Sequence, residues 1–152
     1  MAMPTVVTTP RVEADAAARA SRERDVLSLT AEERRWGRRR VRTRGGRDLA
    51  LALPTGTTLQ PGDVLHLDAT WYVAVEAAPE PVLSVAPRSR EEALRVAFEV
   101  GNRHFPLALD GDRLLVSDDQ AMTQLLTRLG VPWERQMSTF TPIGVGHRHA
   151  NR

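Results

Sequence analysis

Three of the four histidines stand where their side chains could bind a metal ion. His104 directly follows a predicted helix and opens a predicted strand, and His147 and His149 lie two residues apart near the C-terminus. In an extended chain, residues i and i+2 point to the same side, so both C-terminal imidazoles could reach one ion. Imidazole suits nickel, copper and zinc. The sequence therefore predicts a metal site with these three ligands, and a structural role for each histidine is the alternative.

One copy of the chain offers too few imidazoles to enclose such an ion. A late transition metal takes about four to six ligands, and a twofold dimer doubles every ligand. We therefore expect a homodimer in which two His104 side chains face each other and His147 or His149 completes the site. The fourth histidine, His66, is expected to be an ordinary strand residue.

Residue patterns typical of enzymes are absent from the sequence. It has no Gly-rich phosphate loop, no H-E-x-x-H and no G-x-S-x-G. It has no cysteine, which excludes disulfides, thiolate metal ligands and cysteine nucleophiles. The acidic pair Asp118-Asp119 falls in the first turn of a predicted helix, where the helix dipole explains it without catalysis. We expect no enzymatic activity.

Eight arginines gather between residues 34 and 47, with no acidic residue among them. Such a cluster can contact phosphates, so a basic nucleic-acid-binding or protein-docking module is the alternative function. The whole chain is nearly neutral, at +2 from 21 basic and 19 acidic residues. No aromatic residues alternate with these arginines to stack on bases. We expect a solvated or protein-docking face and no nucleic-acid partner.

The first half of the chain predicts a small β domain. Residues 1–25 lack a sustained apolar period and are expected to form a disordered extension. Residues 26–78 form the N-terminal β domain, in which short strands with a period of two alternate with turns. Thr30 and Glu33 have capping-box spacing, which predicts a short helical turn. The expected strands cover residues 38–43, 49–53, 64–67 and 71–75.

The second half, residues 79–142, predicts the element order βαββαβ of a ferredoxin-like domain. Ser89 and Glu92 open a largely buried helix that ends at Gly101, and Ser117 with Gln120 opens a second helix that ends at Gly130. The expected strands cover residues 81–86, 105–109, 113–116 and 133–140. Residues 143–152 are expected to form a flexible, histidine-containing tail. The fold class is therefore α+β.

Hydropathy predicts a cytoplasmic protein that does not contact membranes. No apolar run approaches the roughly 20 residues of a membrane span. The first 20 residues lack the basic segment and apolar core of a secretory signal.

Several segments together resemble one known family. They are residues 29–34 (LTAEER), 53–56 (LPTG), 101–107 (GNRHFPL) and 146–149 (GHRH). In this order, over about residues 26–149, they resemble the urease nickel metallochaperones, the urease accessory protein E family. The segment 101–107 carries most of the resemblance.

The resemblance implies a two-domain protomer and a homodimer with a nickel site at the subunit interface. The N-terminal β domain is likened to peptide-binding chaperone domains, and the ferredoxin-like domain holds the metal. His104 matches the family's interface histidine, and His147 and His149 match its C-terminal histidines. The implied task is the delivery of Ni²⁺ to apo-urease through the accessory GTPase complex. Zn²⁺ or Cu²⁺ is expected to substitute, because such nitrogen ligands bind copper more tightly than nickel and zinc comparably.

Overall fold

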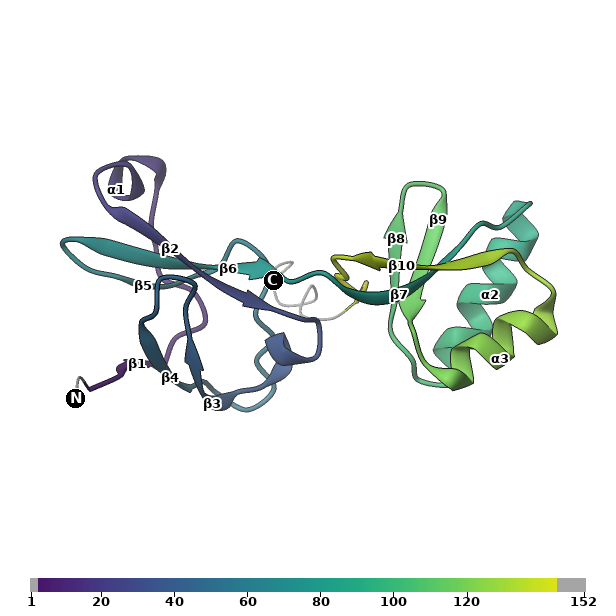
Figure 1. Cartoon of the computed structure of the whole chain (residues 1–152), viewed down its shortest axis with the longest axis horizontal. Coiled ribbons are helices and arrows are strands. Elements are labelled where there is room, and N and C mark those ends of the chain that lie inside the picture. The colour runs from purple at the N-terminus through teal and green to yellow at the C-terminus, as the bar shows by residue number, and fades with distance from the viewer. Residues whose placement is uncertain (1–2, 145–152) are drawn as a thin grey trace. The chain divides into compact units, whose positions relative to one another are not determined.

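The computed structural model describes residues 3–144, and the chain divides into two compact units between Ala78 and Pro79 (Figure 1). Both contain sheets, and the fold class is α+β, as the sequence predicted. No helix in residues 3–144 is long and apolar enough to cross a membrane.

The N-terminal unit contains two three-stranded sheets, in the orders β1-β4-β3 and β2-β6-β5. Its core draws leucines and valines from both sheets, including Leu27, Leu49 and Val73. The elements are β1 (Thr5–Val7), α1 (Ala16–Ala20), β2 (Glu23–Leu29), η1 (Glu33–Arg35), β3 (Arg38–Arg42), β4 (Asp48–Ala52), β5 (Val64–Leu67) and β6 (Trp71–Ala77).

The capping box predicted before η1 is present. The backbone N–H of Thr30 donates to Glu33 Oε1 at 2.8 Å, and the N–H of Glu33 donates to Thr30 Oγ1 at 3.2 Å. This reciprocal pair satisfies two N–H groups that a helix start leaves without partners.

The expectation of a disordered extension over residues 1–25 is wrong for the part that the structure describes. Strand β1 runs parallel to β4, and its Val7 is only 3% exposed. Helix α1 is capped by Asp15, whose Oδ1 accepts from the N–H of Ala18 at 2.8 Å. Strand β2 starts at Glu23 and pairs in parallel with β6. These short elements depend on pairing with distant strands, which leaves little local pattern in the sequence.

A buried carboxylate joins the two sheets of this unit. Asp25 of β2 is 3% exposed and accepts hydrogen bonds from the N–H groups of Val26 and Gly45, both at 2.8 Å. It also accepts from the Thr43 hydroxyl and, at 2.9 Å, from Arg47 Nη1. Except for Val26, these donors lie in the turn between β3 and β4. Asp25 therefore fixes this turn against the other sheet.

The surroundings of Asp25 favour its charged form. Burial alone raises its pKa, but the hydrogen bonds from Thr43, Arg47, Gly45 and Val26 outweigh burial and hold the pKa below its ordinary value of 3.8. The approach is so close that a Cβ on Gly45 would lie 2.9 Å from Asp25 Oδ2. A glycine is therefore required at this point of the turn.

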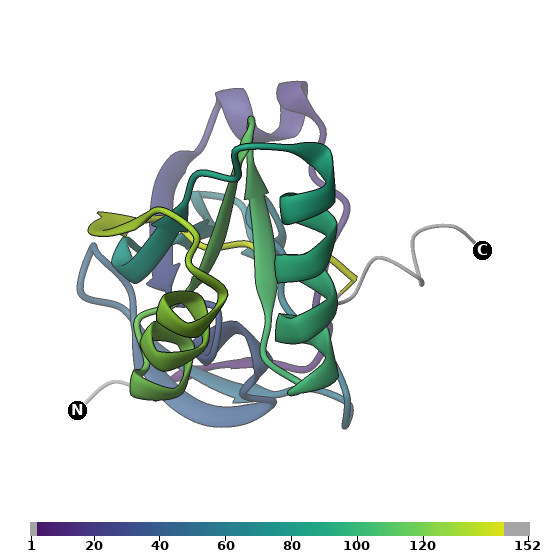
Figure 2. The same cartoon turned by 90° about the vertical axis from the view of Figure 1, so that its right-hand side faces the viewer.

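The C-terminal unit has the element order βαββαβ. Its elements are β7 (Glu80–Val85), α2 (Arg90–Asn102), β8 (Leu107–Asp110), β9 (Arg113–Ser117), α3 (Gln120–Leu129) and β10 (Trp133–Ser138). The strands are antiparallel neighbours in the order β10-β7-β9-β8. Both helices cover one face of this sheet (Figure 2). The core between them contains Leu83, Val116, Val100 and Leu125.

The end of β10 and the chain that follows it lie beside the second face of this sheet. Residues 138, 139 and 141 line a pocket together with Ala108 and Leu115 of the sheet, and Phe140 is 1% exposed. The N–H of Ile143 donates to the carbonyl of Leu107 at 2.8 Å. The end of the described chain is thereby held beside the first residue of β8. The rest of the expected flexible tail, from residue 145 on, lies outside the described residues.

The helix boundaries differ from the predicted ones by a few residues. Helix α2 continues through Gly101 to Asn102, with Arg103 as its C-cap. Helix α3 is capped by Asp119 rather than Ser117, because Asp119 Oδ1 accepts from the N–H of Ala121 at 2.8 Å. The acidic pair therefore lies just before the helix rather than in its first turn: Asp119 is the capping residue, and Asp118 pairs with Arg135 at 3.4 Å.

We predict that Asp25→Asn lowers the free energy of unfolding by about 2–4 kcal/mol, because it removes a buried charge paired with Arg47 and other donors. Because the folded-state pKa is depressed, this stabilisation is full above the unfolded-chain pKa of about 3.9 and declines as pH falls through the folded value. Guanidinium denaturation at pH 7 and at pH 3 measures both effects. Asp48→Asn, which breaks the exposed pair with Arg42, should cost only about 0–1 kcal/mol. Equal losses for the two variants would contradict the role given to Asp25.

Candidate metal-binding site

His104 occupies the residue position at which α2 turns into the following strand. Its N–H donates to the carbonyl of Gly101 at 3.0 Å, and the N–H of Phe105 donates to the carbonyl of Val100 at 3.2 Å. With Arg103 as C-cap, these two bonds form a Schellman motif, in which the residue after the cap adopts a left-handed conformation. That residue is His104, with φ of 62°.

A left-handed conformation is unfavourable for histidine. Among residues 3–144, His104 is the only non-glycine residue with positive φ. At the end of the neighbouring helix α3, the left-handed residue is Gly130, with φ of 71°. Glycine adopts this conformation freely, whereas other residues lose roughly 1 kcal/mol. A side chain kept at this cost points to a function for the imidazole, which is exposed.

The cation next to His104 already has a partner. Nη1 of Arg103 donates to the carboxylate of Glu99, one turn earlier in α2, and to the Glu99 carbonyl at 3.0 Å. This ion pair neutralises a positive charge that would otherwise repel a metal ion at His104.

The described residues do not complete a metal site around His104. No group of three or more His, Asp or Glu side chains in residues 3–144 could hold an ion. His147 and His149, the other predicted ligands, lie outside the described residues. Of the three predicted ligands the described residues include only His104, and the structure holds Ile143, four residues before His147, beside Leu107, three residues after His104.

Helix α2 was predicted to be largely buried, and this prediction is wrong for its apolar residues Leu94 and Phe98. Val96 and Val100 pack into the core, whereas Leu94 and Phe98 are 59% and 68% exposed. Spacings of four and seven residues place Leu94, Phe98 and the exposed Gly101 on one face of the helix. This face ends at the turn that carries His104. Within the described chain α2 packs against the sheet and α3 with its inner face, so the outer apolar residues Leu94 and Phe98 stay in contact with water.

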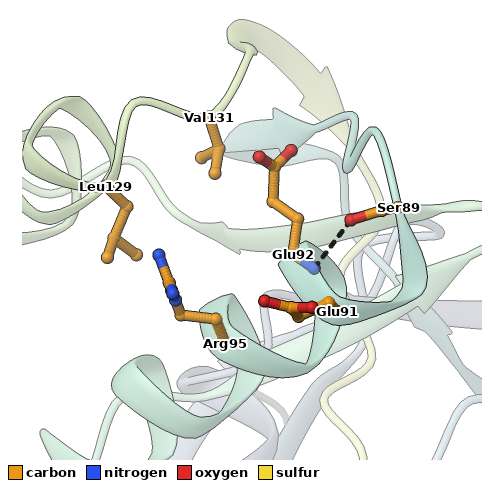
Figure 3. A pocket seen from close by; sticks show the side chains of 6 residues that line it. All are labelled: Ser89, Glu91, Glu92, Arg95, Leu129 and Val131. Carbon is orange, nitrogen blue, oxygen red and sulfur yellow. Dashed lines mark hydrogen bonds between the residues drawn. The ribbon is translucent and has the colours of Figure 1, made fainter.

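A small pocket lies at the opposite, N-terminal end of α2 (Figure 3). It has a volume of about 120 Å³ and is lined by Ser89, Glu91, Glu92, Arg95, Leu129 and Val131. Glu92 accepts from Arg88 Nη2 at 2.8 Å, and the same atom of Arg88 donates to the Gly130 carbonyl at 2.8 Å. These bonds join the start of α2 to the end of α3. The pocket is a feature of this junction and lies about 20 Å along the helix from His104.

His66 lies in β5, as expected for a strand residue. Its ring centroid is 4.9 Å from that of Trp71, and its Nε2 is 3.3 Å from Asp68 Oδ2. The N–H of Thr70 is the main cause of a strongly lowered pKa at Asp68; burial opposes it, and Trp71 and His66 lower it further. His66 is thus a strand residue whose ring contacts Asp68 of the following turn and Trp71 of β6.

Much of the arginine cluster is satisfied within the chain. Arg42 pairs with Asp48 at 3.1 Å, Arg44 with Glu76 at 2.8 Å and Arg47 with Asp25 at 2.9 Å. Arg34 is buried, and its Nη1 donates to the Leu29 carbonyl at 2.8 Å. The acidic partners come from outside residues 34–47, which is why the local sequence showed an unbalanced charge.

Comparison with known proteins assigns both units. The family models described as the N-terminal and C-terminal domains of the UreE urease accessory protein match residues 8–78 and 80–152. The chain is 44% identical over 125 residues to the urease accessory protein UreE of Synechococcus sp. strain JA-3-3Ab, covering 81% of this chain and 83% of the relative. It is 45% identical over 114 residues to that of Deinococcus radiodurans, covering 75% and 74%. The chain belongs to the UreE family.

Membership of the UreE family confirms the resemblance read from the sequence. His104 lies in the segment matched by the C-terminal UreE domain, and the Asp25 carboxylate lies in the N-terminal one. The relatives are named as accessory proteins rather than as enzymes.

We predict that His104→Gly stabilises the C-terminal unit by about 1 kcal/mol, because glycine adopts positive φ without strain. Chemical denaturation followed by circular dichroism measures the change. Asn102→Gly, two residues earlier and still helical, should instead destabilise by a few tenths of a kcal/mol. A loss of stability in His104→Gly would show that the left-handed turn is not strained.

Proposed function

We propose that the protein is a nickel metallochaperone that binds Ni²⁺ and delivers it to apo-urease during urease maturation in the cytoplasm. The observation that carries this proposal is the exposed imidazole of His104, held in an unfavourable backbone conformation at the end of α2. Membership of a family of urease accessory proteins supports the link to urease, and the accessory GTPase is the proposed partner in delivery.

The scaffold proposed for the site is a ferredoxin-like domain. The βαββαβ order and the strand order β10-β7-β9-β8, with both helices on one face, support this arrangement. Such a layer fixes the end of α2 against β8, because Phe105 and Leu107 pack into the core just after His104. The backbone of His104 is thus held rigidly while its ring faces solvent.

A homodimer would supply the second imidazole. The face formed by Leu94, Phe98 and Gly101 is apolar, exposed and on the same helix as His104. Burying a Leu or Phe side chain contributes about 1.5–3 kcal/mol, and glycine permits close approach of a second helix. A twofold contact through this face would bring two copies of the α2 C-terminus near each other, because a symmetric interface uses the same patch twice.

The tail histidines are within reach of His104. Ile143 is held to Leu107 by a hydrogen bond, and Leu107 is at most about 11 Å along the chain from His104. His147 follows Ile143 by four residues, which span up to roughly 14 Å. His147 or His149 can therefore complete the coordination of an ion at His104 and leave it again during transfer.

Imidazole chemistry accounts for binding and release without a chemical reaction. A neutral ring nitrogen donates a lone pair to the ion, and protons compete with the metal for it. Affinity alone does not select nickel, since Cu²⁺ binds nitrogen ligands more tightly and Zn²⁺ comparably. Both ions are therefore expected to substitute in vitro, and the family supports the choice of nickel.

We predict that His104→Ala lowers nickel affinity at least tenfold, because the dimer loses two ligands at once. Isothermal calorimetry with Ni²⁺, with metal analysis of the dialysed protein, measures affinity and stoichiometry. His66→Ala removes a histidine from the other unit and should leave affinity unchanged. Unchanged binding in His104→Ala would refute the assignment.

Deletion of residues 146–152 completes this test. It removes His147 and His149 but none of the proposed dimer contacts. Nickel binding should weaken while the dimer persists. Full affinity after the deletion would show that the tail histidines are not ligands.

We predict that Phe98→Arg converts the dimer to a monomer, because it places a charge in the proposed apolar contact. Light scattering after size-exclusion chromatography measures the mass. Met137→Arg changes an equally exposed apolar residue on β10 and should leave the mass unchanged. A dimeric Phe98→Arg protein that binds nickel fully would exclude this interface.

A further inference from the structure

The outer edge of β3 offers unpaired backbone groups to another strand. In its sheet β3 pairs with β4, and among residues 3–144 no strand lies on its other side. The N–H of Thr43 donates to the Arg47 carbonyl, and the N–H of Leu53 donates to the Gly37 carbonyl. In an antiparallel pair such bonded residues alternate with residues that face away. Arg38, Arg40 and Arg42 therefore direct their N–H and C=O groups to the open edge.

The same three residues present a row of positive charge. Arg38 and Arg40 are exposed and lie opposite Ala52 and Ala50 of β4, on the face away from the core residues Leu49 and Leu51. Arg42 pairs with Asp48. Within residues 3–144, Arg38 and Arg40 make no ion pair. Their charge is available to a partner.

Of the common features that prevent strand pairing, this edge has charged side chains but neither a proline nor a bulge, and its positive charge opposes basic strands rather than acidic ones. Exposed edges are often protected by charged side chains, a proline or a bulge. β3 contains no proline and pairs with β4 in regular register, whereas the edge strand β5 has a register shift between Val64 and His66. A second copy of β3 would place arginine against arginine, which is unfavourable. The charge complementarity therefore favours an acidic strand over a second copy of this chain.

Stacking on nucleic-acid bases is disfavoured because the tryptophans nearby are already in contact with side chains. The guanidinium of Arg39 lies 3.8 Å from the ring centroid of Trp36. Trp71 is contacted by Arg47 at 4.3 Å and by the His66 ring at 4.9 Å. Single-stranded nucleic acids bind through free aromatic faces together with positive charge.

We propose that the open edge of β3 binds an extended acidic segment of a partner protein by strand addition. Backbone hydrogen bonds extend the sheet, and carboxylates at alternate positions of the segment face Arg38 and Arg40. Residues i and i+2 of a strand are about 6.6–6.8 Å apart, so carboxylates at this spacing match these two arginines. The surface lies in the N-terminal unit and does not depend on the metal site.

The test uses the full-length protein and a fluorescein-labelled nine-residue peptide of alternating Thr and Glu, followed by fluorescence anisotropy. We expect Arg38→Gln/Arg40→Gln to weaken binding at least fivefold. Arg90→Gln/Arg128→Gln removes the same charge from exposed positions in the other unit and should change binding less than twofold. Circular dichroism checks the fold of each variant. Absence of peptide binding to the wild type, or equal losses in both double variants, would overturn the proposal.

Modified probes separate strand addition from simple charge attraction without altering the protein. A peptide with Gln in place of Glu should bind at least fivefold more weakly. Two N-methylated forms, one methylated at Glu and one at Thr, block alternate sets of backbone donors. One of the two must bind at least fivefold more weakly than the parent peptide, and equal binding by both would exclude strand addition. Tighter binding of an oligothymidylate of the same charge would overturn the choice of a protein partner.

Discussion

The carboxylate of Asp25 must find hydrogen-bond donors within the protein, because it is almost completely shielded from water. The turn between β3 and β4 supplies three of them, from Thr43, Gly45 and Arg47. An N-terminal unit built of short strands has a limited apolar core, so this polar contact between its two sheets makes a large contribution to the stability of the unit. The same contact positions β3, whose other edge remains open. The arginine row is thus held in place by a residue that lies outside the row itself.

The C-terminal unit depends on a different kind of constraint. Its helices pack against a sheet through apolar side chains, and the residues Phe105 and Leu107 that follow α2 are part of this packing. His104 adopts a left-handed conformation because the Schellman turn demands it, and Gly130 shows the less costly solution in the same unit. Packing of the apolar core offsets the unfavourable backbone conformation of His104. The packed sheet and helices therefore hold the backbone of His104 in place, so the position of its imidazole does not depend on backbone adjustment to a ligand.

Much of this structure could be predicted from local sequence patterns. Alternation of apolar residues located β4, the turn at residues 60–63 preceded the short strand β5, and the capping box of Thr30 and Glu33 located η1. What could not be predicted depends on distant partners. β1 and the start of β2 pair in parallel with strands more than 40 residues away, so Asp25 was assigned to a disordered segment. The end of α2 was placed at Gly101 because glycine commonly follows a helix, although Pro106 allowed a later end. The exposure of Phe98 was not predicted, because an apolar residue on a helix gives the same sequence pattern whether it packs inside its own chain or against another molecule.

The hydrogen bond between Ile143 and Leu107 has a consequence for how the C-terminal histidines act. His147 follows Ile143 by only four residues, so in the proposed metal site the C-terminal imidazoles would be tethered close to His104. Their effective concentration there would lie in the millimolar range and would fall as the segment lengthens. The length of the chain between Ile143 and the C-terminal histidines would then determine how readily their imidazoles dissociate from the ion.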